Sequence, residues 1–98
     1  MFDAWCFDQS GEPITVEAWG ALHDVDGYVF VRKTTIGDVE VSTVWLGIDH
    51  QHGDGPPLIF ETMIFGGDHH GETWRYPTHD DAVAGHEAVT AALFAECN

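Results

Sequence analysis

The chain has 98 residues, 44% of them hydrophobic, and carries a formal net charge of −14 at pH 7. This length predicts one domain spanning residues 1–98 that buries a core without a metal or disulfide cross-links, and the hydrophobic content excludes a disordered chain. Seventeen acids against three cationic side chains repel phosphate backbones and anionic lipid surfaces, so direct binding to nucleic acid or to a membrane is not expected.

The N-terminal third predicts a strand, a short helix and a second strand. Residues 2–7 are rich in aromatic side chains, which favour a strand, and a turn-prone run follows them. Thr15 is suited to cap a helix over Val16–His23, where apolar residues recur at helical spacing. After a turn, residues 28–35 alternate in the manner of a strand.

Residues 39–48 and 58–65 form the centre of the predicted sheet. Side chains alternate between two faces along each segment, and both faces carry apolar residues. We therefore expect a helix over one face and a second cover over the other. The polar loop of residues 49–57, broken by glycine and proline, connects the two strands at the surface.

The C-terminal part predicts an edge strand over residues 72–76 and a helix over residues 78–96, with Thr78 as its N-cap. An apolar stripe at helical spacing marks the side that faces the sheet. The stripe consists of Ala82, His86, Val89, Leu93 and Cys97. Gly85 beside it indicates a close approach of the helix to the sheet. The predicted fold is α+β, with about four mostly antiparallel strands, this helix on one face and the short N-terminal helix at an edge or end.

The two cysteines, Cys6 and Cys97, lie near opposite ends of the chain. Because residues 1–3 show no signal-peptide pattern, we interpret both as reduced thiols rather than as a disulfide. No stretch approaches the roughly 20 apolar residues that a membrane-spanning helix needs. We expect a cytoplasmic protein.

The densest group of metal-binding side chains lies in one loop and comprises Asp49, His50, His52 and Asp54. Two histidines in alternation beside a carboxylate can bind zinc, nickel or iron, but a catalytic zinc site needs three converging protein ligands. The spacing does not enforce that convergence, and residues 68–70 belong to a loop that the hairpin places at the opposite end of the strands. We predict no metal and no other cofactor.

Three further residues each allow more than one interpretation. Glu61 lies in the middle of a strand, where it is turned to solvent, pairs with a cation, or lines a pocket with a raised pKa. Trp45 is either a core residue or an interface anchor. His86 is more simply a hydrogen-bonded core histidine than a ligand. The sequence has no nucleophile elbow, phosphate-binding loop or zinc-spaced cysteine pair, so we predict no catalytic residue.

Five stretches of the sequence are informative together: GEPI at residues 11–14, VSTVWLGIDH at 41–50, PLIFETMIFGG at 57–67, RYPT at 75–78 and GH at 85–86. They resemble a family of small uncharacterised proteins encoded by bacteriophages of actinobacteria and by prophages. The resemblance implies a phage context inside a host cell and no particular activity. Small accessory phage proteins commonly bind a host protein or sequester a small molecule, which is an analogy of context only.

We therefore predict a small acidic phage-type accessory protein that binds a host protein or a small ligand without catalysis, through a sheet face and the His50 loop. The predicted binding residues are Thr43, Trp45, Asp49, His50, Glu61, Thr62, Arg75, Tyr76 and His86. One alternative is a metal-assisted hydrolase that uses Asp49, His50 and His52 with Glu61 as base. The other is an acidic mimic of nucleic acid, and formation of a homo-oligomer is also left open.

Overall fold

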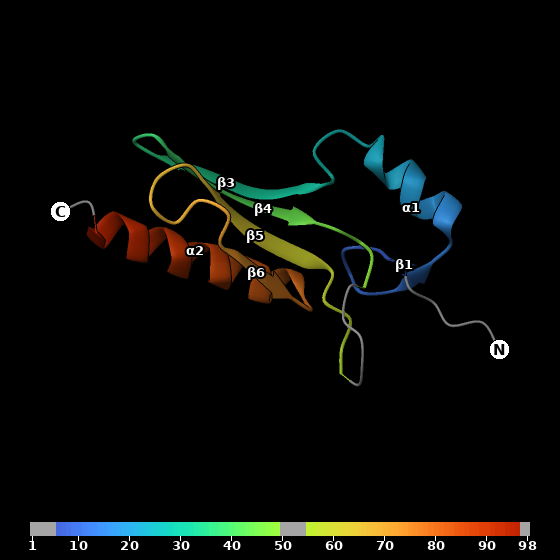
Figure 1. Ribbon diagram of the computed structural model, residues 1–98. Helices are drawn as coiled ribbons and strands as arrows, with labels where there is room; N and C mark the ends of the chain where they lie inside the picture. Colours follow the sequence, from blue (N-terminus) through green and yellow to red (C-terminus); the bar gives the residue numbers. More distant parts are fainter. Residues whose placement is uncertain (1–5, 50–54, 97–98) are drawn as a thin grey trace.

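The computed structural model describes residues 6–49 and 55–96, and every structural statement below refers to these ranges. Its elements are β1 (Cys6–Phe7), β2 (Pro13–Ile14), α1 (Val16–His23), β3 (Phe30–Ile36), β4 (Val39–Trp45), β5 (Phe60–Phe65), β6 (Thr73–Tyr76) and α2 (His79–Glu96) (Figure 1). The four longer strands form an antiparallel sheet in the order β3-β4-β5-β6, and β1 pairs with β2 in a separate small sheet. The predicted α+β class is confirmed.

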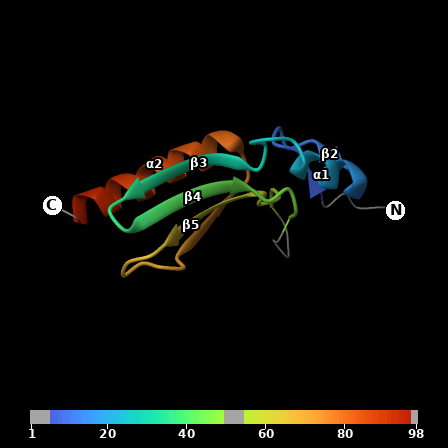
Figure 2. The same ribbon diagram turned by 90° about the horizontal axis from the view of Figure 1, so that it is seen from above.

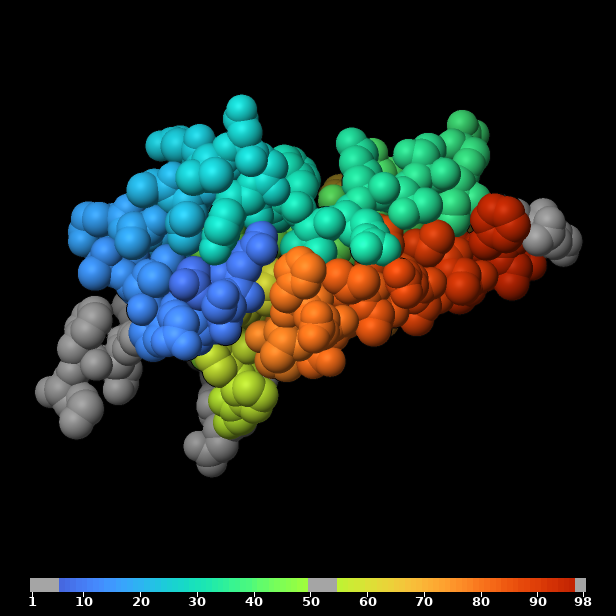
Figure 3. Space-filling view, turned by 180° about the vertical axis from the view of Figure 1, so that it is seen from behind, coloured from blue at the N-terminus to red at the C-terminus, as the bar shows by residue number. Residues whose placement is uncertain are grey.

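The helix α2 lies along one face of the four-stranded sheet and contacts all four strands (Figures 2 and 3). Its buried residues are Ala82, His86 and Leu93, and Val89 packs beside them, so the predicted stripe faces the sheet. Cys97, the last member of that stripe, lies outside the described residues. Neither described helix has the length and apolar composition needed to cross a membrane.

Gly85 allows α2 to approach β6 closely. A Cβ atom at this position would overlap the ring of Tyr76, so any larger residue would displace either that ring or the helix. This confirms the close approach that the sequence indicates.

The strands β4, β5 and β6 are shorter than predicted, while α1 has the predicted bounds. Residues 2–5 of the first predicted strand lie outside the described residues. The backbone N–H groups of Leu46 and Gly47 both donate to the carbonyl of Ile59, at 2.7 and 3.2 Å, which ends the regular pairing after Trp45. Gly47 then turns the chain with a φ of 72°, closely packed against the ring of Trp19. A strand over residues 39–48 is therefore wrong in its last three residues.

Trp45 joins the N-terminal segment to the end of the sheet. Its side chain is 1% exposed, and its indole N–H donates to the carbonyl of Phe7 at 3.0 Å. The ring of Tyr28 meets it edge to face at a centroid distance of 4.9 Å. The indole of Trp19 on α1 donates to the Leu46 carbonyl nearby. Trp45 is thus a core residue, the first of its two interpretations.

A polar network crosses the core beneath α2. His86 is 1% exposed, and its Nδ1 and Nε2 lie 2.7 Å from the hydroxyl of Thr43 and 2.8 Å from that of Thr34. The Thr43 hydroxyl also bonds that of Thr62, on the adjacent strand. A neutral imidazole has one donor and one acceptor nitrogen, which these hydroxyls satisfy. Burial, helped by the positive charge of Arg32, holds the pKa of His86 below its usual range.

The burial of Trp45 generates a stability prediction. We expect Trp45→Ala to lower the free energy of unfolding by about 3–5 kcal/mol, because it leaves a large cavity and an unpaired Phe7 carbonyl. Urea unfolding measures this loss. Trp74→Ala, at a position 37% exposed, is the control and should cost much less. Equal losses in the two variants would contradict the core assignment.

The neutral state of His86 generates a pH prediction. The unfolded chain binds the proton near pH 6.5 and the folded chain only at lower pH, so stability should fall as the pH drops below about 6.5. We expect the urea midpoint to decrease from pH 7 to pH 5 less steeply in His86→Gln than in the unmodified protein. His79→Gln, an exposed position, should keep the original slope. The same slope in all three proteins would refute the buried neutral imidazole.

Candidate binding surface

The face of the sheet opposite α2, called the outer face below, has no described helix over it (Figure 2). Directly paired residues of neighbouring strands point to the same side of a sheet. The strand register therefore places on the outer face the side chains of Phe30, Lys33, Thr35, Glu40, Ser42, Val44, Glu61, Met63, Phe65, Thr73 and Arg75. The second cover that the sequence leads us to expect is not provided by the described residues.

Four apolar side chains lie on the outer face among its polar residues. Phe30 is 64% exposed and Phe65 is 40% exposed, at opposite ends of the face. Val44 and Met63 lie between them and are half-buried. Large apolar side chains gathered on an uncovered surface are typical of interaction sites.

Two ion pairs lie among these apolar residues. The Arg75 Nε donates to Glu61 Oε2 at 3.1 Å, directly across the β5–β6 pairing, and Lys33 Nζ lies 3.3 Å from Glu40 Oε1. Glu61 is therefore paired with a cation, one of its three interpretations. Two cations and two carboxylates make the outer face neutral on a chain whose net charge is −14.

The predicted binding residues fall into separate places. Thr43, Trp45, Thr62 and His86 are all buried on the side of the sheet that faces α2, and there they form hydrogen bonds within the core. Their part in binding stays a prediction. The structure shows that each has a structural role.

The remaining predicted residues include two that meet on the outer face, Glu61 and Arg75. Tyr76 instead packs against α2, and Asp49 accepts a hydrogen bond from the backbone N–H of Leu58 at 3.3 Å. His50 lies outside the described residues. The predicted binding residues do not include the exposed Phe30, Phe65 and Lys33, although the alternation of side chains along the strands is a signal for them.

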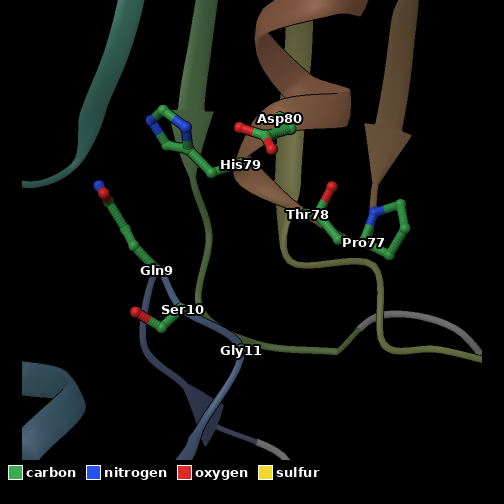
Figure 4. A pocket seen from close by; sticks show the side chains of 7 residues that line it. All are labelled: Gln9, Ser10, Gly11, Pro77, Thr78, His79 and Asp80. Atoms are coloured by element: carbon green, nitrogen blue, oxygen red, sulfur yellow. The ribbon is translucent and has the colours of Figure 1, made fainter.

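A separate open cleft lies between the β1–β2 turn and the start of α2. Gln9, Ser10 and Gly11 face residues 77–80 across it (Figure 4), and its volume is about 510 Å³. Several of its polar groups are already bound. The Gln9 side chain donates to the carbonyl of Tyr28, and the Thr78 hydroxyl accepts from the N–H of Asp81 as the N-cap of α2. Because these polar groups already have partners within the chain, we do not treat this cleft as the candidate binding surface.

Metal-binding groups do not converge in the described part of the chain. No three His, Cys, Asp or Glu side chains of residues 6–49 and 55–96 are placed to hold a metal ion. His50, His52 and Asp54 lie outside these ranges, so the predicted absence of a metal stays a prediction. Cys6 is a free, buried thiol whose pKa is raised by burial and by Glu17, which keeps it protonated.

His69, in the loop between β5 and β6, contacts residues next to the start of β6 and at the end of α2. His69 Nδ1 contacts a carboxylate oxygen of Glu72, just before β6, and its Nε2 lies 2.9 Å from Glu96 Oε1 in the last turn of α2. Hydrogen bonds to Glu72 and Glu96 raise the pKa of His69 to about 9. His69 is therefore a cation at neutral pH and closes the C-terminal end of α2 onto the sheet.

Comparison with protein family models, with curated proteins and with solved structures finds no match for this chain. The function is therefore inferred from the geometry and charge of its own surfaces.

The charge of His69 generates a prediction with the opposite pH dependence from that of His86. The folded pKa of about 9 lies above the unfolded value near 6.5. The stability that His69 contributes to the folded state is thus fully present below pH 6.5 and is lost as the pH rises to about 9. We expect His69→Gln to lower the melting temperature most at pH 6 and least above pH 9. A difference from the unmodified protein that does not change with pH would contradict the charged contact.

Proposed function

We propose that this chain is a non-catalytic binding protein that engages a protein of its host cell through the outer face. The observation that carries the proposal is the uncovered outer face itself, on which exposed apolar side chains alternate with two ion pairs. The phage context comes from the resemblance of the sequence.

The shape of the outer face supports a protein partner over a small ligand. Adjacent strands lie about 5 Å apart, so four strands present a surface roughly 15–20 Å wide. An interface of standard size needs about 800 Å² on each partner, with apolar anchors at its centre and polar groups around them. Val44 and Met63 supply such anchors at the centre of this face, and Phe30 and Phe65 extend the apolar surface to its two ends.

The arrangement of the polar groups supports binding without catalysis. Glu61, the base of the hydrolase alternative, forms an ion pair with Arg75 at 3.1 Å. The buried imidazole of His86 is bonded at both nitrogens to threonine hydroxyls. No arrangement of side chains within residues 6–49 and 55–96 favours the hydrolase.

The charge of the outer face distinguishes the proposal from the nucleic-acid mimic. A mimic would present carboxylates to a basic protein, and its binding would weaken strongly with salt. The outer face is neutral, so binding through it should depend chiefly on apolar contact.

Paired serine substitutions test the proposal. We expect Phe30→Ser with Phe65→Ser to reduce capture of a host protein from an actinobacterial lysate by at least about tenfold, because exposed aromatic anchors often dominate binding energy. The control is Val16→Ser with Val25→Ser, which changes apolar residues 48% and 51% exposed outside the outer face. Capture is quantified by mass spectrometry at two salt concentrations.

Three outcomes would overturn the proposal. Equal capture by both double variants would place the binding surface elsewhere. Capture of basic proteins that disappears in high salt would favour the mimic. Sedimentation that shows a dimer for the unmodified protein and a monomer for Phe30→Ser with Phe65→Ser would replace the host partner with a second copy of the chain.

A further inference from the structure

Two apolar grooves lie on the opposite side of the sheet from the outer face, beside the C-terminal half of α2. The first has a volume of about 240 Å³ and runs between β6 and α2. Trp74, 37% exposed, forms one wall, and the small side chains of Ala88 and Ala92 form the other. Ile64 and Leu93, both buried, lie at its base.

The second groove lies on the other side of the contact between His69 and Glu96. Its volume is about 270 Å³, and Ile36 and Val39 contribute apolar surface to it. His69, Leu93 and Glu96 line both grooves. The contact between His69 and Glu96 therefore separates two halves of a longer apolar depression.

The rim of this depression is acidic. Glu72 and Glu96 border the first groove, and Asp68 borders the second. The cation among the lining residues is His69, which is shared between two carboxylates. The last turn of α2 has no basic residue, so the negative end of the helix dipole adds to the same potential.

The chain's three permanent cations do not neutralise this rim. Lys33 and Arg75 are paired on the outer face, and Arg32 is bound to Glu87 at 3.0 Å. An occupant that suits the depression therefore combines apolar side chains with positive charge. The exposed face of Trp74 is also a favourable contact for a cation.

We propose that the two grooves form one docking site for a basic, apolar peptide segment of a protein partner. Its aliphatic side chains would lie on Leu93 and against Trp74, and its Lys or Arg would replace His69 as the partner of Glu72 and Glu96. The site lies on the face opposite the outer face, so it is independent of the proposed function.

Three short synthetic peptides test this inference: alternating Lys and Leu, alternating Lys and Ser, and alternating Glu and Leu. Each is titrated into the ¹⁵N-labelled protein, and the Trp74 indole N–H resonance, assigned with Trp74→Phe, is followed. The Lys/Leu peptide should bind at least about tenfold more tightly than the Lys/Ser peptide, since apolar burial adds to charge attraction. The Glu/Leu peptide should leave the Trp74 resonance unmoved.

Variants of α2 locate the site. Ala92→Phe fills the first groove and should weaken binding of the Lys/Leu peptide by about tenfold. Ala91→Phe, which changes another exposed alanine of α2, should leave this binding unchanged. His69→Ala should strengthen binding of the Lys/Leu peptide more than binding of the Lys/Ser peptide, because the substitution joins the two grooves as well as removing a positive charge.

The result that overturns the inference is equal affinity of the Lys/Leu and Lys/Ser peptides, which would show attraction by charge alone. Shifts confined to the outer face, or no difference between Ala92→Phe and Ala91→Phe, would also overturn it. Loss of host-protein capture by the outer-face variants tests the proposed function separately, since those substitutions do not touch the grooves.

Discussion

The structure depends on the hydrogen bonds that His86 makes between α2 and two strands. The inner stripe of α2 would otherwise be a row of small and aliphatic residues able to slide on the sheet. A buried imidazole needs partners at both nitrogens, and Thr34 and Thr43 provide them at one position of the helix only. Thr62 extends the network to β5. The polar contacts thus fix the register of α2, and Gly85 sets how closely it approaches β6.

The position of α2 decides which face of the sheet is core. With α2 fixed over Val41, Ile64 and their neighbours, the alternation of the strands sends Phe30, Val44 and Phe65 to the opposite side. No described element returns to cover them. A two-layer domain of this kind leaves a whole sheet face available for contact, at the thermodynamic cost of apolar surface in water.

Much of the fold follows from local patterns in the sequence. The bounds of α1, the stripe of α2 and the close approach at Gly85 are all set by spacing and by residue type, which are local properties. The candidate surface is less predictable, because both faces of the central strands are apolar and their sequence does not say which one α2 covers. Trp45 and His86 carry polar groups typical of sites, yet only their three-dimensional partners show that they are core residues. The Glu61–Arg75 pair likewise depends on the β5–β6 register.

The distribution of only three cations gives the two faces their different character. Lys33 and Arg75 both lie on the outer face, where each offsets one carboxylate and leaves an apolar, neutral surface. Arg32 lies near the buried His86 and binds Glu87. The C-terminal half of α2 therefore has His69 as its source of positive charge, and its grooves are apolar at the base and acidic at the rim. Because a thin domain places these surfaces back to back, the two proposed partners would not compete for the same face, and the charge of each face favours a different kind of partner.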